Sequence, residues 1–357
     1  MSEPGDDVLF ERRGRLGAIV LNRPQAMNAL THQMVQVIAS TLDEWETDDN
    51  VATVLISGAG ERGLCAGGDI VSMYHDALAG GAETEQFWRD EYALNARIAR
   101  YPKPYVAFMD GVVLGGGIGV SAHGSHRIVT ERTRFGMPEV GIGFAPDVGG
   151  SYLLARAPGE TGTHLAMSGG MGSGADAVAL GFADYYVPSE RLGRLAERLE
   201  EIVVADAIAE VAKPAPHSEL LAQRSWIDAC YEGNDAVRIV ERLQAAGPHA
   251  QAAASAILGK SPTGVTVALQ SVRRVRELGA LEAGTLEEVL NQEYRVSVRF
   301  IERPEIVEGI RAQVIDKDRN PQWMPSTLDE VSPAVIEHYF SSLGERELGL
   351  HFAGPAA

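Results

Sequence analysis

Residues Tyr105–Ser121 read YVAFMDGVVLGGGIGVS and follow Pro104. The first five residues form an apolar run of strand length, and Asp110-Gly111 is a turn signal. Four of the five residues from 115 to 119 are glycines, so a ligand can come close to their N–H groups. A helix that begins here adds unpaired N–H donors and the positive end of its dipole. The stretch therefore indicates either a site for an anion or a polarised carbonyl, or a glycine-rich helix packed closely on a sheet.

A second glycine loop follows the apolar strand expected at Val51–Ser57. Its first part, Gly58–Gly63, fits the glycine pattern of dinucleotide-binding proteins. That reading needs a helix to begin within the glycines and then a second strand, whereas the next segment, Ile70–Ala79, has helical character. The pair Gly67-Gly68 is more informative, because it is a flexible loop with free N–H groups, and Asp69 can cap the helix that follows.

The order of predicted elements indicates an α/β protein with a mainly parallel sheet. Strands are expected at 8–12, 16–21, 51–57, 105–109, 125–130 and 185–187, and helices from 31 and at 70–79, 87–101, 152–157, 164–168 and 175–180. From about residue 192 the pattern is almost entirely helical. We therefore expect an α/β core over residues 1–200 and a helical region over residues 201–357 that packs on it.

Composition narrows the functional classes. The 357 residues include 49 acidic and 31 basic ones, for a formal charge of −18. Nucleic-acid binding needs a basic footprint, so we expect no nucleic-acid partner. Cys65 and Cys230 are too few for a disulfide framework, which favours a reducing cytoplasmic compartment. We expect neither a signal peptide nor a membrane span, since no apolar run approaches ~20 residues.

Several familiar catalytic patterns are incomplete in this chain. His123 and His126 have no third metal ligand at a recognisable spacing, and HExxH is absent. The run 119–123 lacks the last glycine of a serine nucleophile elbow. The run 259–261 lacks the earlier glycine of a phosphate-binding loop, and Pro262 interrupts the helix that such a loop needs.

The features that remain are the two glycine loops and one carboxylate, Glu139, in Met137-Pro138-Glu139. Two N–H groups from separate loops suit a thioester or ester oxygen that gains negative charge, and losing one donor typically costs ~3 kcal/mol of barrier. Glu139 can take a proton, activate water or attack the carbonyl, or it can be a solvated loop carboxylate. Asp147, in the same glycine-rich loop, can hold a substrate hydroxyl.

With these motifs in view, the chain resembles the crotonase superfamily of acyl-CoA enzymes, and more narrowly its 3-hydroxyisobutyryl-CoA hydrolase branch. The resemblance covers about residues 8–340 and implies a crotonase-like spiral of ββα turns with a helical C-terminal region. The glycine loops specify the superfamily. The segments that resemble the branch are LNRPQAMNALT at 21–31, CAGGDI at 65–70, MPE at 137–139, PDVGG at 146–150, EYR at 293–295 and IDKD at 315–318. Of these, PDVGG and the two C-terminal segments specify the branch.

The resemblance also implies roles for individual residues. Gly68 and Gly116 match the positions whose N–H groups form the oxyanion hole, and Glu139 matches the catalytic glutamate. Asp147 matches the carboxylate that orients the substrate hydroxyl, and Glu91 matches a substrate-binding glutamate. The expected partner is an acyl-CoA substrate, without a metal or nicotinamide, and the superfamily favours homo-oligomers built on trimers.

One position separates hydrolysis from hydration. Enoyl-CoA hydratases carry a second glutamate two positions after the triple glycine, and this chain has Gly119 there. We therefore expect hydrolysis of 3-hydroxyisobutyryl-CoA, or a similar short 3-hydroxyacyl-CoA, to the free acid and CoA in valine breakdown. Glu139 as nucleophile or as general base stays open. The alternatives are an enoyl-CoA hydratase or isomerase that uses another short acyl-CoA, and a non-catalytic acyl-CoA-binding protein.

Overall fold

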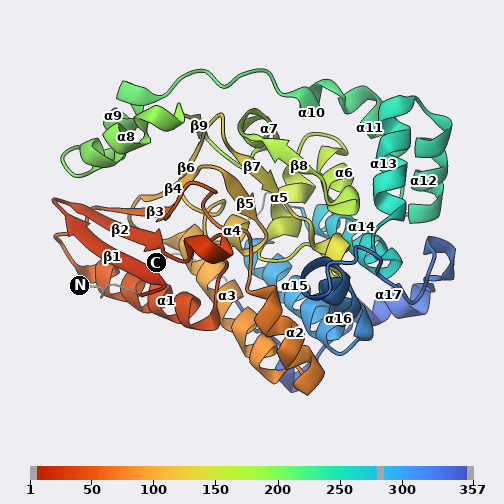
Figure 1. The fold of residues 1–357 in the computed structure, drawn as a ribbon. Coiled ribbons are helices and arrows are strands. Elements are labelled where there is room, and N and C mark those ends of the chain that lie inside the picture. Colours follow the sequence, from red (N-terminus) through yellow and green to blue (C-terminus); the bar gives the residue numbers. More distant parts are fainter. Residues whose placement is uncertain (1–5, 280–284, 352–357) are drawn as a thin grey trace. The chain divides into compact units, whose positions relative to one another are not determined.

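The computed structural model describes residues 6–279 and 285–351 (Figure 1). By compactness the chain forms two units. The first comprises Met1–Gly68, Ala93–Phe135 and Gly172–Glu219, and the second comprises Asp69–Tyr92, Gly136–Met171 and Leu220–Ala357. This grouping runs differently from the division predicted at residues 200 and 201, because each unit combines segments that are distant in sequence.

The first unit contains a six-stranded sheet in the order β1-β2-β3-β4-β6-β9. Strands β1 and β2 are antiparallel, and every other neighbouring pair in this sheet is parallel, as the alternation of strands and helices predicts. The strands are β1 (Val8–Arg13), β2 (Leu16–Leu21), β3 (Thr53–Gly58), β4 (Tyr105–Met109), β6 (His126–Val129) and β9 (Tyr185–Tyr186).

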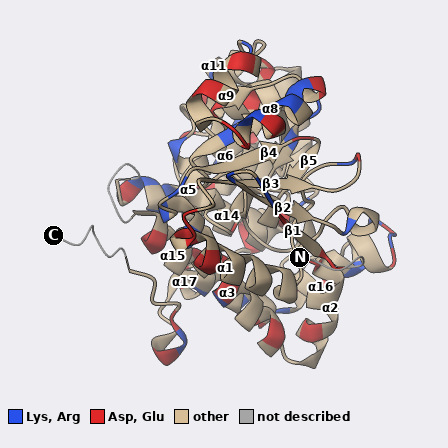
Figure 2. Ribbon diagram, turned by 90° about the vertical axis from the view of Figure 1, so that its left-hand side faces the viewer, with Lys and Arg blue, Asp and Glu red and all other residues tan. Residues whose placement is uncertain are grey.

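One face of this sheet is covered by α8 (Leu192–Leu199) and α9 (Val204–Val211). Apolar side chains of both helices share one buried cluster with sheet residues such as Leu16, Leu55 and Val106. The helical stretch around residue 200 therefore belongs to the α/β unit, which explains why the chain does not divide there. Helix α8 contains basic and acidic residues, whereas the charged residues of α9 are acidic (Figure 2), and Arg198 on α8 pairs with Glu210 on α9 at 2.8 Å.

The opposite face of the sheet is covered near β2 by α1 (His32–Thr47). Successive strand residues point to opposite faces, and Gly17, next to Leu16, faces the ring of Trp45 so closely that a Cβ there would lie 2.6 Å from it. Thr31 caps α1 by accepting the Met34 N–H, as expected. The other elements of this unit are η1 (Pro24–Ala26), β5 (Val112–Leu114), α4 (Gly116–Gly119), α7 (Gly174–Leu180) and η3 (Ser189–Arg191).

The second unit is mainly helical. Its elements include α2 (Ile70–Ala79), η2 (Glu139–Ile142), α5 (Gly150–Arg156), α6 (Thr161–Ser168), α10 (Glu219–Ala222), α11 (Arg224–Cys230), α12 (Ala236–Ala245), α13 (Pro248–Leu258), α14 (Pro262–Glu277), α15 (Thr285–Ile301), α16 (Pro304–Ile310), η4 (Arg311–Ile315), η5 (Leu328–Glu330), α17 (Pro333–Phe340) and η6 (Gly344–Arg346). Among the described elements, four have residues in both units, namely α3 (Ala82–Arg100), β7 (Arg134–Gly136), β8 (Met171–Ser173) and α10, whose first residue, Glu219, belongs to the first unit. None of the described helices is both long and apolar enough to cross a membrane.

Helix α3 begins five residues before the start predicted at Phe87. The carboxylate of Asp76 on α2 accepts the Thr84 N–H at 2.7 Å and so satisfies a donor of the first turn. This cap comes from the preceding helix rather than from the residue next to the helix start, which is why the local pattern missed it.

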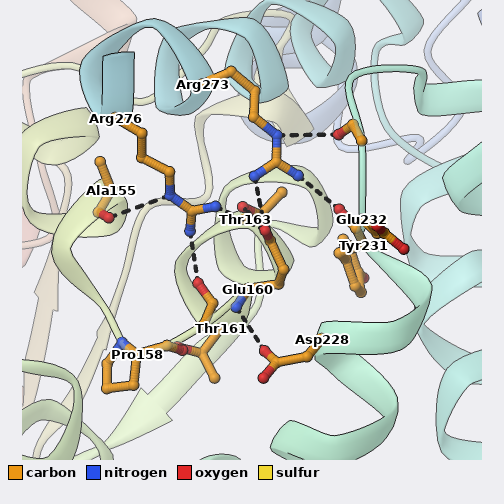
Figure 3. Close-up of polar contacts among 12 residues, drawn as sticks. Ala155, Pro158, Glu160, Thr161, Thr163, Asp228, Tyr231, Glu232, Arg273 and Arg276 are labelled. Atoms are coloured by element: carbon orange, nitrogen blue, oxygen red, sulfur yellow. Dashed lines mark hydrogen bonds and ion pairs between the residues drawn. The ribbon is translucent and has the colours of Figure 1, made fainter. Parts of the chain in front are cut away.

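Helix α14 is anchored in the second unit by a partly buried ion-pair network (Figure 3). Arg273 donates to both carboxylate oxygens of Glu160 at 2.8 and 2.9 Å, and Arg276 donates to one of them at 2.8 Å. The Glu160 N–H donates to Asp228 at 2.8 Å, and Arg273 also donates to the Tyr231 carbonyl at 2.6 Å. Because charge-assisted hydrogen bonds of this kind fix direction as well as distance, the network holds α14, α11 and the start of α6 together.

Candidate active site

The two glycine loops lie side by side in the first unit. The Cys65 N–H donates to the Val112 carbonyl at 3.1 Å, and the Leu114 N–H donates to the Cys65 carbonyl at 3.0 Å. A Cβ on Gly117 would lie 2.5 Å from the Cys65 carbonyl oxygen. Glycine at position 117 therefore allows α4 to begin directly against the second loop.

Both proposed amide donors are available in this arrangement. Gly116 is the first residue of α4, so its N–H has no acceptor within that helix. A Cβ on Gly67 would lie 3.9 Å from the Gly116 nitrogen, which places the neighbouring Gly68 close to it along the chain. In the described loops, the Gly68 N–H donates no hydrogen bond to a backbone carbonyl. The Gly67 N–H lies 3.4 Å from the Cys65 sulfur. The structure thus brings Gly68 and Gly116 together, and their role in an oxyanion hole stays a prediction.

Glu139 lies in the second unit as the first residue of η2. This turn is packed against α14 and α16, since the Ser261 N–H donates to the Val140 carbonyl at 3.0 Å and a Cβ on Gly309 would lie 2.2 Å from Ile142. The Glu139 side chain is only 7% exposed, and one carboxyl oxygen, Oε2, is buried without a hydrogen-bond partner. A buried, partly unsatisfied carboxylate on a fixed turn is suited to proton transfer or to nucleophilic attack.

Asp147 lies in a loop whose backbone is held by Glu293 on α15. The Glu293 carboxylate accepts the Gly149 N–H at 2.6 Å and the Ser151 N–H at 2.8 Å. Between Asp147 and these donors the chain takes left-handed backbone conformations, with φ of 53° at Val148 and 76° at Gly149. Such conformations persist where surrounding contacts enforce them. Glu293 appeared in the sequence only as part of the EYR motif, and nothing near position 293 indicates that it holds a loop 144 residues away.

The Asp147 side chain contacts the hydroxyl of Tyr92, which in turn contacts the hydroxyl of Ser297. Tyr92 Oη lies 2.8 Å from Asp147 Oδ2 and 2.7 Å from Ser297 Oγ. The Ser297 hydroxyl in turn donates to the Glu293 backbone carbonyl at 2.9 Å. The sequence analysis missed Tyr92 and Ser297, and the only signal for Tyr92 was its position beside Glu91.

Glu91, Glu139, Asp147 and Glu293 form a buried acidic cluster in the second unit. Burial is the largest cause that raises each pKa, and the negative charge of Asp147 further raises those of Glu91, Glu139 and Glu293. Burial raises the pKa of Asp147 to about 7 and that of Glu293 to about 8, although the Ser151 and Gly149 N–H groups oppose the shift at Glu293. The cluster is therefore partly protonated near neutral pH. The predicted residues Glu91, Glu139 and Asp147 are brought together here.

Among residues 6–279 and 285–351, His, Cys, Asp and Glu side chains form no group of three or more that could hold a metal ion. His123 and His126, which were weighed as ligands, accordingly have no third partner of these types in the described chain. In the acidic cluster, Glu293 contacts backbone N–H groups and Asp147 contacts the Tyr92 hydroxyl.

This chain resembles known proteins in sequence and in fold. The family model described as enoyl-CoA hydratase/isomerase matches residues 16–340. A curated relative from Danio rerio, named 3-hydroxyisobutyryl-CoA hydrolase, mitochondrial, is 39% identical over 98% of this chain and 93% of its own length. Because this match and the family model both span nearly the whole chain, the likeness includes both units.

Two solved structures share the fold over nearly the whole chain. A protein from Mycobacterium thermoresistibile, named carnitinyl-CoA dehydratase, is 51% identical with a TM-score of 0.92 and covers 96% of this chain and 98% of its own. An enoyl-CoA hydratase from Rhodobacter sphaeroides is 39% identical with a TM-score of 0.91 and covers 97% and 100%, respectively. These matches confirm the predicted crotonase-like α/β fold. The chain belongs to the enoyl-CoA hydratase/isomerase family, in the branch of the 3-hydroxyisobutyryl-CoA hydrolases.

Proposed function

We propose that this protein hydrolyses 3-hydroxyisobutyryl-CoA, or a similar short 3-hydroxyacyl-CoA, to the free acid and CoA in valine breakdown. The observation that carries the proposal is Glu139, a buried carboxylate with an unpartnered oxygen and within electrostatic reach of Asp147, in a chain that has Gly119 where hydratases carry a second glutamate. The name of the Danio rerio relative supports the same substrate.

In the proposed reaction the Gly68 and Gly116 N–H groups donate to the thioester oxygen as it gains negative charge. Glu139 then acts in one of two ways. As a nucleophile it attacks the carbonyl carbon, the C–S bond breaks to release CoA thiolate, and water cleaves the mixed anhydride. As a general base it removes a proton from water while the water oxygen attacks. Both routes add one water and yield the acid and CoA thiol.

The acyl group is proposed to be held by its hydroxyl end. Asp147 binds the 3-hydroxyl, and Glu91 lies in the same buried cluster as a further substrate contact. We propose that neither a metal nor a nicotinamide takes part, since hydrolysis changes no oxidation state and two backbone amides supply the polarisation. Dialysis against a chelator is expected to leave thiol release unchanged, and a loss that added metal restores would contradict this.

A second candidate is dehydration or hydration of an acyl-CoA. It is favoured by the 51% identical protein that carries the name carnitinyl-CoA dehydratase. Such a reaction moves a proton at the α carbon and also a hydroxyl at the β carbon, so two acid–base groups are needed. Gly119 supplies none. A third candidate, binding of acyl-CoA without turnover, predicts that no thioester is consumed.

A thiol-release panel over short acyl-CoAs, with and without a 3-hydroxyl, distinguishes these candidates. The expected result is thiol release from 3-hydroxyisobutyryl-CoA, with loss of turnover but retained ester binding in Glu139→Gln. Turnover of crotonyl-CoA without thiol release would replace hydrolysis with hydration. Binding of the ester without any chemistry would leave only the binding protein.

We further propose that the protein acts in the cytoplasm. Cys65 and Cys230 are both buried and form no disulfide in the described chain, as a reducing compartment allows. The curated relatives carry a mitochondrial designation in their names, so the prediction needs a direct test. Fractionation of cells that produce the tagged full chain should place it with cytosolic markers, and recovery with a mitochondrial or membrane fraction would contradict it.

Finally, we propose that the chain forms a homo-oligomer built on trimers. The proposal rests on the preference of the superfamily that the motifs resemble. Light scattering on the eluting protein over a range of concentrations should give a multiple of three chain masses. A monomer or dimer mass throughout would rule out the trimer.

A further inference from the structure

Four groups of the second unit form one hydrogen-bond chain that ends on a backbone carbonyl. The order is Asp147 Oδ2, Tyr92 Oη, Ser297 Oγ and the Glu293 carbonyl oxygen, with successive separations of 2.8, 2.7 and 2.9 Å. Tyr92 and Ser297 are fully buried. These hydroxyls therefore satisfy their hydrogen-bonding capacity within the protein.

The hydrogens needed by this chain can be counted from its fixed end. A carbonyl oxygen only accepts, so the single hydroxyl hydrogen of Ser297 lies between Ser297 and Glu293. The contact between Tyr92 and Ser297 then uses the hydrogen of Tyr92. No hydroxyl hydrogen is left for the contact between Tyr92 and Asp147, and a carboxylate has none. In this arrangement two hydroxyl hydrogens serve two of the three contacts, and the third contact uses a hydrogen carried by Asp147.

The opposite arrangement is less satisfactory. If Tyr92 donates to Asp147, Ser297 must donate to Tyr92. The Ser297 oxygen would then face the Glu293 carbonyl oxygen at 2.9 Å without a hydrogen between them. Back-bonding to the carbonyl four residues earlier is a common habit of serine inside a helix, and Ser297 is four residues after Glu293 on α15. The geometry therefore favours donation from Ser297 to the backbone.

We propose that Tyr92 and Ser297 are positioning residues that hold Asp147 as a neutral acid with its proton on Oδ2, which leaves Oδ1 as the acceptor for the 3-hydroxyl of the substrate. The proposal rests on the proposed function for the identity of that hydroxyl. The protonation state itself follows from the protein contacts alone. It assigns a direction to the hydrogen bond, since Asp147 accepts from the substrate and donates to the enzyme.

The protonation state of Asp147 affects the ionisation of the other carboxyl groups in the cluster. The groups that face Asp147 are Glu91 and Tyr92 from α3, Glu139 from η2 and Glu293 from α15. After burial, the charge of Asp147 is the next cause that raises the pKa of Glu139. A neutral Asp147 removes that cause, and Glu139 ionises more readily. The hydroxyl chain thus directs the proton to Asp147 and leaves Glu139 as the carboxylate that either catalytic route needs.

Infrared difference spectroscopy between the wild type and Asp147→Asn tests the proton directly. Near neutral pH, the wild type is expected to show the carbonyl band of a protonated carboxylic acid that the variant lacks. Absence of this band would overturn the proposal. The spectrum needs no substrate. A failed thiol-release assay would therefore contradict the proposed function without deciding the protonation state of Asp147.

Substitution of Ser297 tests the direction of donation along these hydrogen bonds. In Ser297→Ala the Tyr92 hydrogen is free to donate to Asp147, so the pKa at which the acid band disappears should fall by ~1 unit. Ser297→Thr keeps the hydroxyl and should restore the wild-type value. The matched control is Ser271→Ala, because Ser271 is equally buried and its hydroxyl has no hydrogen-bond partner. A pKa that is unchanged or raised in Ser297→Ala would show that Tyr92 already donates to Asp147.

Tyr92→Phe tests positioning in the reaction. Asp147 loses the group that orients it, so KM for 3-hydroxyisobutyryl-CoA should rise about tenfold more than KM for isobutyryl-CoA, which lacks the hydroxyl. Tyr339→Phe, at another fully buried tyrosine of the second unit, is the control for the loss of a phenol group. Equal changes for both substrates would assign Tyr92 a purely structural role.

Discussion

Glu293→Gln is the most informative single substitution for the loop that carries Asp147. In the wild type, both oxygens of one buried carboxylate accept backbone N–H groups, from Gly149 at 2.6 Å and from Ser151 at 2.8 Å. Glutamine offers one oxygen and one NH₂ group, so one of the two N–H donors faces another donor. A buried donor left unsatisfied costs ~1–3 kcal/mol. We expect the free energy of unfolding to fall by about 3 kcal/mol.

The same substitution should also affect catalysis. The lost contact frees a loop that holds Val148 in a left-handed conformation, and Asp147 precedes it directly. A displacement of about 1 Å at a substrate-positioning group can lower the rate about 100-fold. Urea unfolding and kcat/KM for thiol release measure the two effects on one preparation.

Glu305→Gln is the matched control. Glu305 is similarly buried, but its carboxylate accepts a hydrogen bond from the Ser261 hydroxyl at 2.7 Å. A glutamine oxygen can accept the same hydroxyl, so the loss of stability should be small. If Glu293→Gln costs less than about 1 kcal/mol, or no more than Glu305→Gln, the two N–H contacts do not hold the loop as argued.

Three further predictions concern other parts of the molecule. Gly117→Ala places a Cβ 2.5 Å from the Cys65 carbonyl oxygen. We therefore expect the rate of thiol release to fall about 100-fold or more, while binding of the CoA ester is largely kept. A fall below threefold would contradict the close approach of the two glycine loops. Glu160→Gln removes the carboxylate that pairs with Arg273 and with the partly exposed Arg276. Urea unfolding should show a loss of about 1–3 kcal/mol, against little change in the exposed pair variant Glu241→Gln. The raised pKa of Asp147, about 7, means that the folded chain keeps a proton that the unfolded chain releases at lower pH. Its stabilising contribution is therefore present below pH ~4 and is lost as pH rises toward ~7, a dependence that Asp147→Asn should lack when unfolding midpoints are compared across this range.

Local signals explain what the sequence could predict. The strand at Tyr105–Met109 and the helix at Ile70–Ala79 have the predicted bounds, because an apolar run between turn signals and a capped helix are each encoded by neighbouring residues. The two glycine loops and the carboxylates at 91, 139 and 147 were likewise visible as motifs. Their convergence within each unit follows from the parallel sheet and from the packed helices.

Contacts between distant segments explain what the sequence could not predict. Tyr92 meets Asp147 across 55 residues and Ser297 across 205, and Glu293 meets Gly149 across 144. Single tyrosines, serines and glutamates have many ordinary positions on helices, so no local pattern singles these out. The compact units also differ from a simple division near residue 200, because the apolar faces of α8 and α9 complete the sheet core.

Helix α15 holds Asp147 twice. Glu293 fixes the backbone of its loop, and Ser297, one helical turn later, fixes its side chain through Tyr92. Both attachments lie on one rigid rod, so a slide or rotation of α15 moves the loop and the hydroxyl chain as a pair. Substitutions far along this helix, away from any substrate atom, would then alter substrate affinity and turnover together. Directed evolution of α15, or a molecule that binds to this helix, could therefore change substrate affinity and turnover without contact with the acyl group.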